Sequence, residues 1–211
     1  MGTQKDGLHG PVEGRIGNLV HYVLNGKNVS RLIGRSTKPA SLKQRAVRQR
    51  MKVVTEFLRS TLYYINLGFA TEVLGTDKNP HNAAVSYNFT HATVGEYPEI
   101  QIDYSKVRVS SGTLAPPTGL TLTNQLNSLE ISWEVAGLTS QGTGGDRSMV
   151  LLYFPEQDSS LIFFNDVQRY QGIFKVEIPA DSRNQRMEAY LAFSDVGTHS
   201  TSPSAWAGSI L

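Results

Sequence analysis

Leu129-Glu130-Ile131-Ser132-Trp133 alternates apolar and polar side chains and ends in a large ring, the pattern of a strand with one buried face. Similar short apolar segments recur about every ten to fifteen residues after Pro116-Pro117. With Trp133 on the second segment and Tyr190 on the sixth, seven such strands are typical of a β-sandwich. The other segments are Leu120 to Leu122, Met149 to Phe154, Leu161 to Phe164, Phe174 to Ile178, Met187 to Phe193 and a last stretch ending at Leu211.

The sequence before Pro116 predicts a hairpin that follows a glycine-rich arm. Leu19 to Leu24 and Asn28 to Ile33 flank Asn25-Gly26-Lys27, and Asn-Gly supplies the positive φ angles of a tight turn. Five glycines up to Gly17 indicate an extended arm ahead of this hairpin. We therefore expect the chain to begin with an arm and two paired strands.

Two helices are predicted after the hairpin. Ser41 and Gln44 have the spacing of a capping box, and the first helix is expected from Leu42 to about Leu67. Asn79-Pro80 should begin a shorter helix that ends near Ala92. The first helix has an apolar face wider than one domain needs to cover. Its stripe consists of Val47, Met51, Val54, Leu58, Leu62 and Ile65, widened by Ala46, Val53, Phe57 and Tyr64.

One or two strands are expected between Ile100 and Val109, and the proline-containing segment Thr113 to Thr118 reads as a linker. We therefore predict an α+β protein with a boundary near residue 115. Residues 1–114 would form an α+β domain of arm, hairpin, helices and strands, and residues 115–211 would form the sandwich.

Composition excludes several kinds of protein. The 211 residues contain no cysteine, which excludes disulfides, zinc-thiolate sites, iron–sulfur clusters and a cysteine nucleophile. No apolar run approaches the ~20 residues of a membrane-spanning helix, and the N-terminus lacks the apolar core of a secretory signal. We expect synthesis in the cytoplasm without a signal peptide and no membrane insertion. An extracellular or virion-associated destination is left open.

Charge is unevenly distributed along the chain. Residues 1–60 contain 12 basic and 3 acidic residues, whereas the rest contains 8 basic and 15 acidic residues. This asymmetry suits either an anionic partner for the front part or contact between front and back parts of neighbouring copies. The candidate residues for self-association or polyanion contacts are Arg31, Arg35, Lys38, Arg45, Arg48, Lys52 and Arg59.

Motifs of catalysis and metal binding are weak here. The five histidines show no metal-binding spacing, and no Gly-x-Ser-x-Gly occurs. Gly142-Thr143-Gly144-Gly145-Asp146 lacks the Lys-Ser/Thr that follows in a phosphate loop, so a flexible loop is the simpler interpretation. Glu96, Glu99 and Asp103 resemble ordinary solvated acids. No catalytic, metal or cofactor-binding residue is therefore predicted. Trp133 and Trp206 would form a sugar platform only if both were exposed.

Two family resemblances follow from these residues. Residues 116–211 resemble a fibronectin type III domain in the proline before the first strand, Trp133, Tyr153, Tyr190 and Ser202-Pro203. The whole chain resembles an uncharacterised bacterial family of unknown function, also similar to small phage-associated proteins. That second likeness rests on a larger set: Gly14 to Asn18, Gly34-Arg35, Lys38-Pro39, Gln44, Arg45, Arg48, Asn79-Pro80, Gly95 to Pro98 and Asp103 to Ser105.

The resemblances predict the architecture of the protein but imply no activity. The interpretation we favour is a non-enzymatic structural protein of a bacterial surface, filamentous or phage-related assembly. It would form a homo-oligomer or filament through its N-terminal half. Two alternatives stay open: a nucleic-acid or polyanion binder that uses residues 31–52, and a carbohydrate-binding or adhesion module that uses the sandwich.

Overall fold

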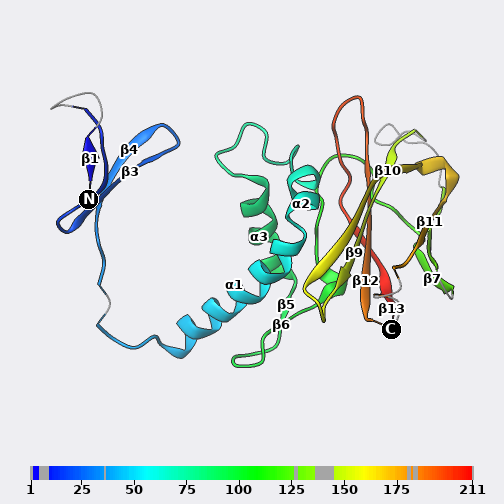
Figure 1. Ribbon diagram of the computed structural model, residues 1–211, viewed down its shortest axis with the longest axis horizontal. Helices are drawn as coiled ribbons and strands as arrows, with labels where there is room; N and C mark the ends of the chain where they lie inside the picture. The colour runs from blue at the N-terminus through cyan, green and yellow to red at the C-terminus, as the bar shows by residue number, and fades with distance from the viewer. Residues whose placement is uncertain are drawn as a thin grey trace. The chain divides into compact units, whose positions relative to one another are not determined.

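A computed structural model describes residues 2–4, 10–35, 37–125, 128–135, 145–179, 182 and 185–210. The chain divides into two compact units, residues 1–41 and 42–211. Helices and antiparallel sheets are both present (Figure 1), so the predicted α+β class is confirmed. In the described part of the chain, no helix is long and apolar enough to span a bilayer.

The first unit is a four-stranded antiparallel sheet in the order β1-β2-β3-β4. The predicted hairpin is confirmed, with Asn25 and Gly26 at φ 49° and 74° in its turn. Part of the predicted arm is itself a strand, because residues 14–16 pair with the first hairpin strand. Residues 1 and 5–9 of the arm lie outside the described residues. The strands are β1 (Thr3–Gln4), β2 (Val12–Ile16), β3 (Leu19–Leu24) and β4 (Lys27–Leu32).

The second unit begins with a layer of helices. The predicted long helix is two helices, α1 (Leu42–Ser60) and α2 (Leu62–Gly68). Thr61 lies between them, and its hydroxyl bonds back to the carbonyl oxygens of Phe57 and Leu58. The shorter helix α3 (Pro80–His91) confirms the predicted start, since the Asn79 side chain accepts a hydrogen bond from the Asn82 amide at 2.7 Å.

The segment after α3 differs from the prediction of strands from Ile100 to Val109. Only β6 (Gln101–Ile102) forms there, paired with β5 (Thr93–Val94). The Asp103 carboxylate accepts hydrogen bonds from the backbone and hydroxyl of Ser105, which favours a turn over an extended chain. The short 3₁₀ helix η1 (Tyr104–Lys106) follows.

All seven predicted C-terminal strands are present, and they form two antiparallel sheets. The four-stranded sheet has the order β10-β9-β12-β13 and the three-stranded sheet has the order β11-β8-β7. Residues 136–144, most of the long loop expected near Gly142, lie outside the described residues. The strands are β7 (Thr121–Gln125), β8 (Ser128–Ser132), β9 (Arg147–Phe154), β10 (Ser159–Gln168), β11 (Ile173–Glu177), β12 (Met187–Ser194) and β13 (Ala205–Ile210).

The second unit has three layers, which are the helices, the four-stranded sheet and the three-stranded sheet, with one core between each pair of neighbouring layers (Figure 1). One core lies between the two sheets and includes Ile131, Trp133, Leu152 and Phe193. The other lies between the four-stranded sheet and the helices. Its members are Val54, Phe57, Leu58, Tyr64, Ile65, Phe69, Ala83, Ala84, Ala92, Val107, Val109, Met149, Leu151, Tyr153, Tyr190 and Ala192. Strands β9 and β12 are therefore buried on both faces.

This second core explains why the division into units differs from the boundary predicted near residue 115. Residues on both sides of that boundary share one core, and the Tyr64 hydroxyl donates to the Met149 carbonyl oxygen at 2.8 Å. The compact units separate between Ser41 and Leu42 instead. The helical layer is part of the same body as the two sheets.

Candidate functional site

The seven basic residues singled out from the sequence belong to two different units. Arg31 lies on β4, and Arg35 and Lys38 follow it in the first unit. Arg45, Arg48, Lys52 and Arg59 belong to α1 in the second unit. The three residues of the first unit and the four residues of the second are therefore described separately.

The four cations of α1 share one exposed face of the helix. At 100° per residue their side chains fall within a narrow arc, opposite the buried Val54 and Phe57. Two of them already have acidic partners: Lys52 lies 3.7 Å from Glu56, and Arg59 Nη2 lies 2.9 Å from Asp158 Oδ2. This face is basic, yet part of its charge is neutralised within the chain.

The predicted apolar stripe of the first helix is only partly covered. Val54, Leu58 and Ile65 are buried in the core beneath the helices, but Val47 and Met51 are 53% and 42% exposed. Leu62 is also exposed. The N-terminal half of α1 thus carries apolar side chains that its own unit leaves in contact with solvent.

The N-terminal sheet has no buried residue among its described positions. Ile16 pairs with Leu19, and Leu19 pairs with Leu32, so these three side chains lie side by side on one face. Their exposed fractions are 50%, 38% and 73%. We call them the apolar row. On the opposite face, Arg31 lies over the Tyr22 ring at 5.9 Å.

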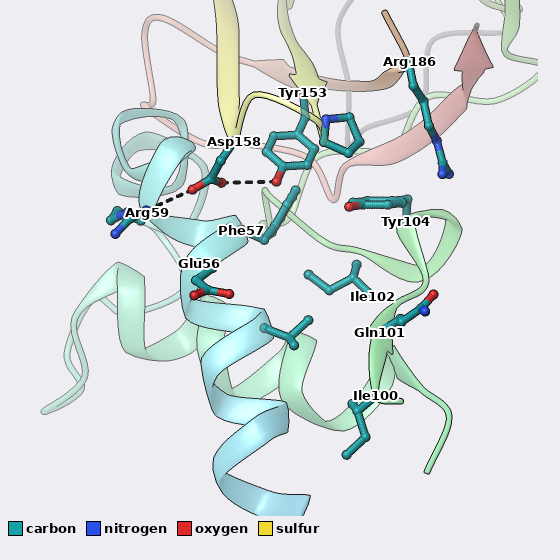
Figure 2. Close-up of a pocket in the computed structure, with 12 residues that line it drawn as sticks. Glu56, Phe57, Arg59, Ile100, Gln101, Ile102, Tyr104, Tyr153, Asp158 and Arg186 are labelled. Atoms are coloured by element: carbon teal, nitrogen blue, oxygen red, sulfur yellow. Dashed lines mark hydrogen bonds and ion pairs between the residues drawn. The ribbon is translucent and has the colours of Figure 1, made fainter. Parts of the chain in front are cut away.

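A pocket of about 470 Å³ lies where α1 meets β6 and the turn between β9 and β10 (Figure 2). Phe57, Ile100 and Ile102 supply apolar walls. Phe57 and Tyr153 pack edge to face with ring centroids 4.7 Å apart, and Tyr104 lies 5.8 Å from Tyr153. Burial raises the pKa of the Tyr153 and Tyr104 hydroxyls, so both stay neutral donors at physiological pH.

The rim of this pocket is polar, and Asp158 links two of its side chains. Its carboxylate accepts from the Tyr153 hydroxyl at 3.3 Å and pairs with Arg59, as Figure 2 shows. Asp158 has a φ of 47°, a left-handed conformation that aspartate tolerates better than most residues. Arg186 lies over the Tyr104 ring at 5.4 Å. A pocket with apolar walls and a polar rim has the composition of a binding site for a small molecule or for a partner's side chain.

Sequence reasoning missed this pocket. Tyr153 was interpreted as a sandwich residue, and Glu56 and Asp158 were not singled out. The four residues Tyr104, Tyr153, Asp158 and Arg186 come from three separate segments, because Tyr153 and Asp158 belong to the same β9–β10 hairpin, so no single spacing motif could have joined them. Among the described residues, no three histidine or acidic side chains gather as a metal site would require.

The class that this fold and these surfaces define is an α+β protein with a two-sheet body, a helical layer and a separate N-terminal sheet. A family model described as a family of unknown function (DUF6266) matches residues 11–208. The chain belongs to this family, which confirms the resemblance to an uncharacterised family. A comparison with curated proteins gives no match.

Proposed function

We propose that the protein is a non-enzymatic, self-assembling structural protein of a bacterial surface, filamentous or phage-related assembly. Its N-terminal sheet would be a contact between copies. The observation that carries this proposal is the apolar row of Ile16, Leu19 and Leu32, because it is aligned across three strands and uncovered within its own unit.

A sheet of this size needs a covered apolar face. A sheet with one apolar face is stabilised when that face is buried against another element. The described part of the N-terminal sheet has no buried side chain to supply this stabilisation. Exposed aligned aliphatic side chains are also a recurrent feature of association surfaces. If a surface from outside the sheet covered the apolar row, the free-energy cost of exposing these side chains to water would be removed.

A second copy is the occupant that the charges favour. Residues 1–60 have nine more basic than acidic residues, and the remainder has seven more acidic than basic residues. Copies arranged front to back would place opposite charges together. The exposed Val47 and Met51 on α1 offer further apolar area to such a contact.

The body of the protein supports a fibronectin type III-like sandwich as part of the proposal. The sheet orders β11-β8-β7 and β10-β9-β12-β13 suit that topology, and Trp133 lies in the core between the sheets. Tyr153 and Tyr190, which contributed to the fibronectin resemblance, lie in the core beneath the helical layer and not between the two sheets.

The test is the oligomeric state of the full chain at tens of micromolar, measured by sedimentation velocity. We expect an assembly larger than a dimer, and Leu32→Ser should reduce it to smaller species. Leu24→Ser is the matched control, because Leu24 is also an exposed leucine of the same sheet but lies on the opposite face. A monomeric wild-type chain would contradict the proposal. So would an assembly that both substitutions weaken equally.

The second candidate is a nucleic-acid or polyanion binder. The observation in its favour is the shared exposed face of Arg45, Arg48, Lys52 and Arg59 on α1. The partners of Lys52 and Arg59 within the chain count against it, since paired cations release fewer counterions on binding phosphate.

A further inference from the structure

A second pocket, separate from the one in Figure 2, lies between the end of α3, the segment after β6 and the start of β13. Its volume is about 460 Å³, within the range of small-molecule sites. Tyr87, His91, Arg108 and Trp206 line it together with short polar side chains and Lys106. Aromatic rings and cations therefore gather at one place on the second unit.

Arg108 is the cation of this pocket that has no acidic partner among the described residues. Its guanidinium lies over the Tyr87 ring, 4.1 Å from the centroid, and the Tyr87 ring lies 4.6 Å from that of His91. Lys106, by contrast, is paired with Asp103 at 2.8 Å. One guanidinium is thus held in position, and no other described residue accepts a hydrogen bond from its donors.

The backbone of Arg108 is fixed from inside the protein. Asn88 on α3 is buried, and its side chain accepts from the Arg108 amide at 2.9 Å and donates to the Arg108 carbonyl oxygen at 2.8 Å. These two bonds join the end of α3 to the segment that carries the guanidinium. Such anchoring lowers the entropy that would be lost when the guanidinium binds an anion.

Trp206 supplies a flat surface at the same pocket, although 36% of the residue is exposed. Its indole Nε1 donates to the Glu188 carboxylate at 2.9 Å, and Glu188 is fully buried and paired with Arg186 at 2.8 Å. A buried carboxylate is costly to retain. Here the Glu188 carboxylate fixes the orientation of the Trp206 ring. A ring that is held in place but not fully packed is available to contact a ligand.

We propose that this pocket binds an acidic sugar, with the carboxylate on Arg108 and the ring face on Trp206. A guanidinium binds a carboxylate through two parallel hydrogen bonds. A pyranose ring presents C–H groups that pack on an indole face. One unpaired arginine matches one negative charge, whereas a nucleotide phosphate calls for more donors. This site is separate from the apolar surfaces proposed for self-association, because none of its lining residues belongs to the N-terminal sheet or to α1.

The test uses the full chain and three probes: D-glucuronate, neutral D-glucose and inorganic phosphate. Binding is followed by NMR chemical-shift changes, with the Trp206 indole signal as the local reporter. We expect glucuronate to bind with a Kd of about a millimolar or tighter and at least ~10-fold more tightly than glucose. Phosphate should bind no better than glucose.

Variants test the contributions of Arg108 and of Trp206 separately. Arg108→Gln should lower the affinity for glucuronate about tenfold, to the level of glucose. Arg108→Lys should restore it only in part, because lysine keeps the charge and loses the two-bond geometry. Trp206→Ala removes the indole reporter, so its titrations follow the Arg108 backbone amide signal, and both sugars should bind more weakly. Arg147→Gln removes one positive charge elsewhere on the same unit and should change nothing.

Two outcomes would overturn the proposal. One is the absence of glucuronate-induced shifts at about ten times the expected Kd. The other is phosphate binding as tight as glucuronate with the same loss in Arg108→Gln, which would identify a simple anion site. Because Arg108→Gln leaves the aromatic rings and the Asn88 bonds in place, its fold is checked by an unchanged spectrum away from the pocket.

Discussion

The Tyr190 hydroxyl donates a hydrogen bond to the backbone carbonyl oxygen of Tyr104, 2.9 Å away. Tyr190 lies on β12 in the middle of the four-stranded sheet, and Tyr104 lies in η1, ahead of the prolines that were expected to form a linker. Ser160 makes a similar connection, because its hydroxyl donates to the Ser60 carbonyl oxygen at 2.6 Å. Hydrogen bonds as well as apolar contacts therefore unite the helical layer with the sheet.

Tyr190→Phe should destabilise the protein although it keeps the ring. Tyr190 is fully buried, and the substitution removes one of the two hydrogen bonds that the Tyr104 carbonyl oxygen accepts, the other coming from the Val107 amide at 3.3 Å. We expect a loss of about 0.5–1.5 kcal/mol in the free energy of unfolding, measured by urea denaturation. Tyr170→Phe is the control, because Tyr170 is exposed and should cost almost nothing. Equal stability of the two variants would show that the buried bond contributes nothing.

The shared core predicts how fragments behave. A fragment of residues 42–211 keeps both cores and should unfold in one cooperative transition. A fragment of residues 115–211 exposes the sheet face that contains Met149, Leu151 and Tyr190, and should bind a hydrophobic dye or aggregate. Calorimetry and dye fluorescence of the two fragments provide the comparison. If residues 115–211 fold alone with the stability of the longer fragment, the boundary near residue 115 is the real one.

The seven C-terminal strands could be predicted because each is short, apolar and bounded by turn residues. Their cover by helices was not predicted, although the sequence contains a sign of it. Met149 to Phe154 has six consecutive apolar residues, and in the structure they alternate between the two cores. A strand with one wet face would alternate polar and apolar side chains, so an unbroken apolar run indicates burial on both faces.

The sites could be predicted only in part, because their residues are far apart in the sequence and meet only in the folded chain. The pattern of α1 revealed an apolar face that its own unit leaves uncovered at Val47 and Met51. It did not reveal the aromatic and cationic pocket, because Tyr87, Arg108 and Trp206 come together only through folding. Asp103 to Ser105 contributed to the family resemblance as a motif, and the structure shows the turn that this motif forms.

Trp133→Ala should test the core between the two sheets. The Trp133 ring is buried, packs edge-on to Phe193 with centroids 5.5 Å apart, and its Nε1 donates to the Arg169 carbonyl oxygen at 2.8 Å. We expect the free energy of unfolding to fall by about 3–5 kcal/mol. Trp133→Phe keeps a ring and loses the hydrogen bond, so it should cost less. Thermal unfolding of residues 42–211 measures both, and a small loss for the alanine variant would argue against a packed core at this position.

Asp103→Asn should reveal a stability contribution that depends on pH. Hydrogen bonds from Lys106 and Ser105 hold the pKa of the Asp103 carboxyl below its ordinary value. Such a group stabilises the fold above its unfolded pKa of about 4, and the contribution is lost as the pH falls through the lowered pKa. The variant should be less stable than wild type at pH 7 by no more than about 1 kcal/mol, because the pair is partly exposed. Urea denaturation should show that difference shrinking toward pH 2; a constant difference would show that the carboxylate charge is not its source.

The last prediction separates self-assembly from nucleic-acid binding by their response to salt. If oppositely charged parts of neighbouring copies attract, the assembly should weaken from 50 mM to 1 M salt, because exposed charges are screened over about 8–10 Å already at physiological ionic strength. Replacing Arg45 and Arg48 with Glu should weaken it at low salt, and Lys78→Glu, on the same unit away from α1, is the control. Sedimentation velocity at the two salt concentrations measures the effect.

A parallel titration with a labelled oligonucleotide tests the competitor. We expect weak binding that fades by physiological salt, because Lys52 and Arg59 already have acidic partners. Submicromolar binding that is lost on replacing Arg45, Arg48 and Lys52 would instead establish the polyanion binder. An assembly that stays unchanged or tightens in 1 M salt would show that apolar burial, through residues such as Leu32 in the apolar row, is the main force and that the charge asymmetry has another role.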